Sequence, residues 1–319
     1  MRLVVVFLRI FGQIVFLILP GQEIKLAINL MITVLIVIII HSIFKAIVEN
    51  LGNNSTAKII YFIQYLIIVT LITDSFVTVI DLTRNSIQEV INFMNLLIPL
   101  LSTLMLTTGC ITTTGIVQPI ILFMISFIGN FISNFIIPML LISITLGIVS
   151  NISDKIQITR LSNFLKSSIV WILGIILTIF VCSLSIEGTL SSSVDGMTAK
   201  TAKAAVSNFI PIVGKILGDS VDSIIGCGNV LKNAVGVIGV IIIAGIVVVP
   251  ILKLGILWIS FYVLSGVCEV VADEKIVKLI AQISDSYKIL LAILFSVSIM
   301  FIIGVTLVLK ITNSSLMYR

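Results

Sequence analysis

The chain contains few charged residues, and this shortage excludes most soluble classes of protein. Charged residues make up 10% of its 319 residues, hydrophobic residues make up 59%, and the mean hydropathy is +1.30. A soluble globular domain carries about 25% charged residues. The sequence is therefore that of a polytopic membrane protein with a small water-soluble part. The net charge of +5 is spread along the chain, which predicts contact with lipid headgroups and argues against nucleic-acid binding.

The sequence also lacks the residue patterns of metal sites and of common catalytic sites. His41 is the single histidine, and no Walker loop, Gly-x-Ser-x-Gly or His-Glu-x-x-His motif is present. Gly226-Cys-Gly228 is a lone glycine pair, which we interpret as a helix end. We therefore expect no cofactor and no enzymatic activity, so that a nucleotide-driven step would need a separate ATPase. The four cysteines have no metal-ligand spacing and are interpreted as packing residues: Cys110, Cys182, Cys227 and Cys268.

Apolar runs long enough to cross a bilayer account for most of the chain. A spanning helix needs about 20 mostly apolar residues at 1.5 Å of rise each. The predicted fold is all-α, a polytopic transmembrane helical bundle of about nine spans, within a range of eight to ten. Polar connectors are expected at 81–89, 151–166 and 272–287. The predicted spans are 27–48, 58–80, 91–110, 116–127, 131–149, 167–186, two within 234–271, and 288–311.

Three stretches leave the number of spans open. Residues 1–20 carry Arg2, Arg9 and Gln13 on one helical face, which is typical of an interfacial helix, although a true span is the alternative. Residues 116–149 form either two spans or a re-entrant pair. The apolar run 234–271 measures about 57 Å as a helix, so we expect two spans that meet near Pro250–Lys253.

Two polar stripes lie within the predicted spans. Asp74 shares a helical face with Thr70, Thr78 and Asp81, and is the candidate intramembrane acid. Acids inside a membrane are costly and often functional, but a position at the membrane interface is at least an equal alternative for Asp74. The second stripe recurs every four residues and is the candidate interhelical polar stripe: Ser126, Asn130 and Asn134.

The segment 191–233 is amphipathic and divides the chain. Its apolar residues recur at gaps of three and four, which predicts a helix, and Pro211 predicts a kink between two short helices. The expected organisation is an interfacial segment 1–26, a first membrane bundle 27–190, this extramembrane or interfacial element 191–233, and a C-terminal bundle 234–319. The element either rests on the lipid surface or docks partner subunits. The candidate docking residues are Lys200, Lys203, Pro211, Gly214, Lys215 and Asp219.

The central element resembles the stage III sporulation protein AE family, multipass membrane proteins of endospore-forming Firmicutes. The resemblance extends from about residue 30 to the C terminus. Members of that family tend to have a longer N-terminal region, often with a signal sequence, so the resemblance implies a start that is either shortened or differently assigned. The residues that carry the resemblance are the run from Thr201 to Lys215, then Asp219, Lys232-Asn-Ala-Val-Gly236 and Pro250-Ile-Leu-Lys253.

The resemblance implies a non-enzymatic membrane subunit of the complex that joins the mother cell to the engulfed forespore. Such a complex is similar to secretion machines, contains an ATPase and other membrane subunits, and supports forespore development. The implied location is the mother-cell membrane around the forespore. A self-contained small-molecule permease is the alternative function, although the inverted repeats typical of permeases are not convincing in this sequence. An intramembrane enzyme is a third, disfavoured hypothesis, because no pair of catalytic groups is visible.

Overall fold

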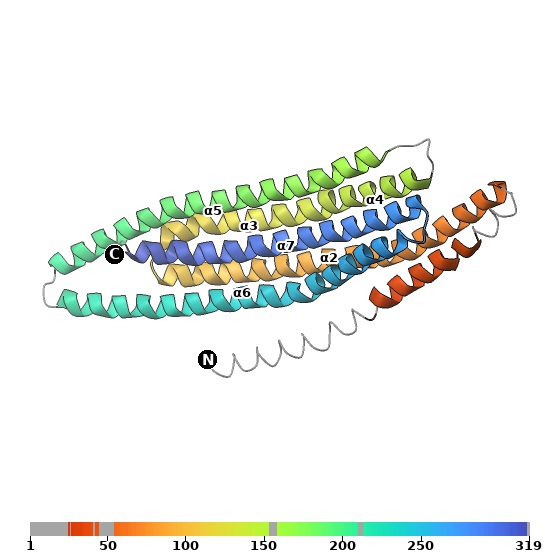
Figure 1. Cartoon of the computed structure of the whole chain (residues 1–319). Coiled ribbons are helices and arrows are strands. Elements are labelled where there is room, and N and C mark those ends of the chain that lie inside the picture. The colour runs from red at the N-terminus through yellow and green to blue at the C-terminus, as the bar shows by residue number, and fades with distance from the viewer. Residues whose placement is uncertain are drawn as a thin grey trace. The chain divides into compact units, whose positions relative to one another are not determined.

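The computed structural model of the chain consists of long helices (Figure 1). It describes residues 25, 27–40, 42–44, 54–152, 158–209 and 213–317, and these residues contain no strand. A helix over Ala27–Phe44 comes first. The following elements are α2 (Asn54–Thr107), α3 (Ile111–Phe131), the π-helix η1 (Ile132–Ile136), α4 (Ile137–Ile152), α5 (Thr159–Phe209), α6 (Val213–Cys268) and α7 (Glu274–Met317).

Six helical stretches of the described chain are long and apolar enough to cross a membrane. The prediction of an all-helical membrane protein is therefore confirmed, whereas the count of about nine spans is not. The six stretches are Ala27–Phe44, Tyr65–Thr107, Ile111–Asn151, Thr159–Asp195, Ile225–Cys268 and Glu274–Ile311.

Three of the predicted breaks between spans are helical in the structure, and this accounts for the lower count. Residues 81–89 lie inside α2, and the expected reversal at Pro250–Lys253 is wrong because α6 continues to Cys268. A re-entrant pair at 116–149 is also wrong, since α3 leads into η1 and α4 without a turn. Joining these three pairs of predicted spans reduces nine to six.

The continuity of α2 has a physical reason in its buried face. Ile80, Thr83, Ile87 and Val90 are buried and follow one another at gaps of three or four, so the polar residues between them occupy the opposite side of one uninterrupted helix. Prolines do not stop these helices, and Pro99 and Pro250 lie inside α2 and α6. Membrane helices tolerate proline because neighbouring groups satisfy the freed backbone carbonyl.

The chain forms two compact units, and each is assembled from separated parts of the sequence. Unit 1 comprises Met1–Asn85, Asn134–Trp171 and Val248–Leu294, and unit 2 comprises Ser86–Ser133, Ile172–Val247 and Phe295–Arg319. The two units are defined by contacts between residues and not by function. Whether the predicted boundaries at 26, 190 and 233 separate functional parts stays a prediction.

The core of unit 1 is centred on Tyr287 of α7, which is fully buried. Its ring centroid lies 5.3 Å from that of Phe76 on α2 and 5.2 Å from that of Phe261 on α6. The Tyr287 hydroxyl lies 3.4 Å from Ser75 Oγ. Three helices of unit 1 therefore meet in one layer around this ring, with its polar atom directed at a hydroxyl group.

The core of unit 2 relies on glycines where helices approach closely. A Cβ atom on Gly304 of α7 would lie 2.9 Å from the Phe180 ring, and one on Gly239 of α6 would lie 2.6 Å from Leu97. Small residues at such points allow backbones to approach, which is the usual basis of helix packing in membranes.

Candidate functional site

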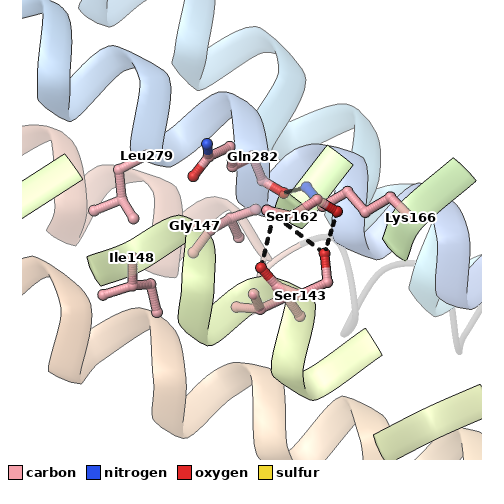
Figure 2. A pocket seen from close by; sticks show the side chains of 9 residues that line it. Ser143, Gly147, Ile148, Ser162, Lys166, Leu279 and Gln282 are labelled. Atoms are coloured by element: carbon pink, nitrogen blue, oxygen red, sulfur yellow. Dashed lines mark hydrogen bonds between the residues drawn. The ribbon is translucent and has the colours of Figure 1, made fainter. Parts of the chain in front are cut away.

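A buried polar cluster in unit 1 joins α4, α5 and α7 (Figure 2). Its polar members are Ser143 on α4, Ser162 and Lys166 on α5, and Gln282 on α7. Both serines are fully buried, and Lys166 is only 7% exposed. A lysine in this position is unusual, because ionisable residues within membrane helices are costly and usually paired.

The two serines bind each other's backbone. Ser143 Oγ donates to the Ser162 carbonyl oxygen at 2.8 Å, and Ser162 Oγ donates to the Ser143 carbonyl oxygen at 2.7 Å. The two hydroxyl oxygens lie 3.2 Å apart. Such reciprocal bonding requires the backbones of α4 and α5 to be close, which small side chains permit.

Lys166 is held by the backbone of α7. Its Nζ atom donates to the carbonyl oxygen of Gln282 at 2.9 Å, and Ser286 Oγ donates to the same oxygen at 2.7 Å. The Asp285 carboxylate contributes a favourable charge interaction with the Lys166 ammonium. The buried charge therefore has both a hydrogen-bond acceptor and an opposite charge within unit 1.

The Gln282 side chain completes the cluster. Asn151 Nδ2 donates to Gln282 Oε1 at 2.9 Å. A Cβ atom on Gly147 would lie 2.7 Å from the same Oε1, so a larger residue there would displace this amide from its place against α4.

The geometry of the cluster suits mechanical fixation of three helices. The crevice among these residues is too narrow to hold a water molecule. The donors named above point at protein acceptors, and no group of three metal-ligating side chains occurs in the described part of the chain. The arrangement gives α4, α5 and α7 one fixed register, since polar groups in an apolar surrounding hold their partners.

A second polar cluster lies in unit 2 at the start of α3. A turn at Thr108–Gly109 leads into α3, with Gly109 in the left-handed region at φ 78°. The buried Asp195 of α5 accepts hydrogen bonds from the backbone N–H groups of Thr112 and Thr113, both at 2.8 Å. A carboxylate at a helix N-terminus satisfies orphan donors and complements the helix dipole. Asp195 therefore caps a helix far from it in the sequence.

Lys232 of α6 belongs to the same region of unit 2. Its side chain is fully buried, and Nζ lies 3.3 Å from Asn229 Oδ1. About one helical turn earlier, Gly228 faces the threonine turn, where an added Cβ atom would lie 2.9 Å from Thr108 Cγ2. The prediction that Gly226-Cys-Gly228 ends a helix is wrong, because α6 runs through it.

The residues predicted from the sequence do not gather into either cluster. Asp74 is exposed on α2, and its stripe with Thr70, Thr78 and Asp81 is exposed as a whole. The three residues of the interhelical stripe are also exposed on this chain: Ser126, Asn130 and Asn134. That this stripe contacts other helices stays a prediction, and those helices would belong to another protein chain.

The predicted docking residues lie at the end of α5 and the start of α6. Lys200 and Lys203 are on α5, and Gly214, Lys215 and Asp219 are on α6, but their side chains and all of Pro211 lie outside the described residues. The helices do end on either side of Pro211. They are not short, however, because they are parts of helices of 51 and 56 residues.

The sequence interpretation missed Lys166, Asp195 and Lys232, although a signal for each was present. Each lies in the register of the buried stripe of its helix, because the residues of that stripe are separated by about whole numbers of helical turns. On α5 this stripe includes Ser162, Lys166, Ile169, Leu173, Phe180, Leu184 and Asp195. A charged residue in register with buried apolar residues is the pattern that would have identified them.

Comparisons with known proteins identify the family. The model of the stage III sporulation protein AE family matches residues 7–312. The chain belongs to the stage III sporulation protein AE family. It is 30% identical over 286 residues to the stage III sporulation protein AE of Bacillus subtilis (strain 168), which covers 89% of this chain and 72% of that protein.

Family membership confirms the resemblance that the central element carries. It is also consistent with a sporulation role for a protein with six membrane-capable helices in its described part. No solved structure matches the chain.

Proposed function

We propose that the chain is a non-enzymatic membrane subunit of a secretion-like channel complex between mother cell and forespore. Its place is the mother-cell membrane around the forespore, and its activity is required for forespore development after engulfment. Other membrane subunits and a separate ATPase complete the complex. The proposal starts from membership of a sporulation family and from six helices able to cross a membrane.

The observation that carries the proposal is the length of the exposed apolar surface of α6. Large apolar side chains are exposed on this helix from Val230, at 72%, to Val248, at 41%, and again from Ile259, at 56%, to Val267, at 48%. A straight helix from Val230 to Val267 measures about 56 Å at 1.5 Å per residue. A bilayer core of about 30 Å covers only about 39 Å of a helix tilted by about 40°, which is the upper end of observed tilts.

On a straight α6, part of this apolar surface would extend beyond the lipid hydrocarbon. Large exposed apolar surfaces in contact with water mark interaction sites. Another subunit that covers the remainder is the simplest solution, and it favours a complex over a self-contained permease. The predicted docking residues between Lys200 and Asp219, at the end of α5 and the start of α6, would provide a second contact with the same complex. We call this stretch the α5–α6 corner.

The first test is photo-crosslinking in sporulating cells. A photoreactive phenylalanine analogue replaces Val230 in one variant and Val267 in another. On a straight α6 the two positions would not fit into hydrocarbon together, so we expect at least one variant to crosslink to another membrane protein of the complex. Crosslinks to lipid alone at both positions would contradict the proposal.

Co-purification identifies the partners. Tagged protein from sporulating cells should recover further membrane proteins and an ATPase, whereas the same protein produced in vegetative cells should not. Uptake of a small molecule by vesicles that contain this chain alone would instead favour the permease.

A further inference from the structure

The exposed face of α2 changes from apolar to polar within unit 1. Between Ile59 and Ile67 its exposed residues are large and apolar. From Thr70 to Asn85 the large apolar residue on the exposed face is Val77. The other exposed residues, which we call the α2 polar face, are Thr70, Thr73, Asp74, Thr78, Asp81 and Asn85.

Another helix of unit 1 has an apolar exposed face in the same layer. Tyr287 contacts Phe76 of α2 and Phe261 of α6, so residues around 76 and around 261 lie at one level of this unit. The exposed residues of α6 at that level are Ile259, Tyr262 and Val263, at 56%, 70% and 49% exposure. The two helices therefore present surfaces of different chemistry from one layer.

The threonines of the polar face do not decide what covers it. Thr70 Oγ1 donates to the Leu66 carbonyl oxygen at 2.8 Å, and Thr78 Oγ1 donates to that of Asp74 at 3.1 Å. Threonine hydroxyls that bond within their own helix tolerate lipid.

The two acids and the asparagine indicate what covers the α2 polar face. The side chains of Asp74, Asp81 and Asn85 make no hydrogen bond or ion pair within the described part of the chain. Groups of this kind within apolar helices face water or a polar partner, because hydrocarbon offers them no hydrogen bonds.

A direct contact with a second copy of this chain is disfavoured by charge. The exposed ionisable groups of the α2 polar face are two carboxylates, whereas Arg84 on the same side of α2 is half-buried, so close self-association would bring the exposed carboxylates of two copies together in an apolar surrounding. An apolar partner would leave the carboxylates without hydrogen-bond donors. Water satisfies all six side chains without a dedicated partner for each.

We propose that the α2 polar face borders a water-filled path that favours cations over anions. Rings or rows of Asp and Glu give cation preference in known pores. The part of α2 that belongs to unit 2 also begins with exposed polar residues, Gln88, Glu89, Asn92 and Asn95. The inference deepens the proposed channel function by naming a surface of the path.

The experiment measures the reaction rate of single cysteines with small charged thiol reagents. The exposed native cysteines are first replaced by Cys182→Ser and Cys227→Ser, while the buried Cys110 and Cys268 remain and define the background rate. Thr78→Cys and Asn85→Cys report on the polar face. Val263→Cys is the matched control, since it lies in the same layer on the apolar face. The reagents react with thiolate, which forms in water and not in hydrocarbon.

We expect Thr78→Cys and Asn85→Cys to react at least about ten times faster than Val263→Cys. A cationic methanethiosulfonate should react faster than an anionic one, and Asp74→Asn with Asp81→Asn should reduce that preference. Equal rates at all three positions would mean that water surrounds the whole layer, and would overturn the proposal. Rates at background on α2, or a disulfide between two copies through Thr78→Cys, would overturn it as well.

The same measurement separates this inference from the proposed function. It is made on vesicles with this chain alone and on membranes from sporulating cells. Fast reaction on the polar face in both supports a water-facing surface, even if no partner subunits are recovered. Recovery of partners with background rates on α2 would leave the channel subunit in place and reject this face as its lining.

Discussion

Lys166 and Gln282 join α5 to α7 through a bond between an ammonium group and a backbone carbonyl. The Nζ to O distance is 2.9 Å, and the same oxygen accepts Ser286 Oγ at 2.7 Å. Charge-assisted hydrogen bonds are roughly twice as strong as neutral ones. Because the acceptor is backbone, no replacement of the Gln282 side chain removes it. The lysine is therefore the member of this pair that substitution can test.

Charge reversal at Lys166 should prevent correct packing of unit 1. Lys166→Glu places a carboxylate against the Gln282 carbonyl oxygen and near Asp285, so buried acceptors are left without donors. Lys166→Met removes the charge but keeps the length, and Ser286 still donates to the carbonyl oxygen. We expect the loss of monodisperse protein in detergent for Lys166→Glu and a much smaller effect for Lys166→Met, measured by size-exclusion chromatography.

The matched control for this charge reversal is Lys278→Glu on α7. Lys278 is exposed and paired with Glu274 at 2.6 Å. Exposed pairs contribute only about 0–1 kcal/mol, so this variant should behave like the native chain. Equal behaviour of Lys166→Glu and Lys278→Glu would show that the buried lysine does not fix these helices.

Removal of the Asp195 carboxylate should loosen the first turn of α3. Asp195→Ala leaves the N–H groups of Thr112 and Thr113 without their acceptor. Loss of a helix cap costs about 0.5–2 kcal/mol. Amide hydrogen exchange at Thr112 and Thr113 should become faster, while that in the middle of α3 stays unchanged. Unchanged exchange at both residues would contradict the capping role, and Cys182→Ala at an exposed position of α5 is the control.

Gly226 and Gly228 should respond differently to the same substitution. Alanine favours a helix over glycine by about 1 kcal/mol, so Gly226→Ala, whose added Cβ meets nothing within 4 Å, should raise the thermal midpoint. At Gly228 the added Cβ would lie 2.9 Å from Thr108 Cγ2, so the gain should be lost. Gly228→Leu should lower the midpoint further. Equal midpoints for the two alanine variants would contradict close packing at Thr108.

Helix type could be predicted from the sequence, whereas helix continuity could not. The apolar periodicity correctly gave an all-helical membrane protein. The polar run 81–89 was taken as a connector because composition averages over all sides of a helix, and the buried residues Ile80, Thr83 and Ile87 become visible only through contacts. The predicted break at Pro250 was wrong for a similar reason, since the surroundings of a membrane helix determine whether proline interrupts it.

The polar clusters depend on contacts between distant parts of the chain. Ser143 and Gln282 are far apart in sequence, and neither has a local pattern that indicates the other. Lys166 and Lys232 could have been suspected from their register with buried apolar residues. The residues that they contact could not have been predicted, because a single sequence does not show which helices pack against one another.

The exposed stripe of Asn130 and Asn134 should matter for assembly and not for folding. Both side chains are exposed on this chain, so Asn130→Leu with Asn134→Leu removes no contact within it. The thermal midpoint of the purified variant should stay unchanged, while recovery of partner proteins from sporulating cells should fall. Phe123→Leu, at an exposed apolar position of α3, is the control. Full recovery with the double variant would mean that the stripe contacts no other subunit.

The α5–α6 corner, between Lys200 and Asp219, should be required for the docking of other subunits. Lys200→Glu with Lys203→Glu reverses two charges near the end of α5, a part of the chain outside the most apolar spans. Such charges should not prevent membrane insertion. We expect normal protein level but a block in sporulation after engulfment, scored by spore yield and microscopy. Lys200→Arg with Lys203→Arg keeps the charges, and cells with this variant should sporulate normally.

Pro211→Ala restores a backbone donor at the corner, which favours a continuous helix, and should cause a milder defect. Normal spore yield in the double glutamate variant would reject docking and favour a corner that rests on lipid.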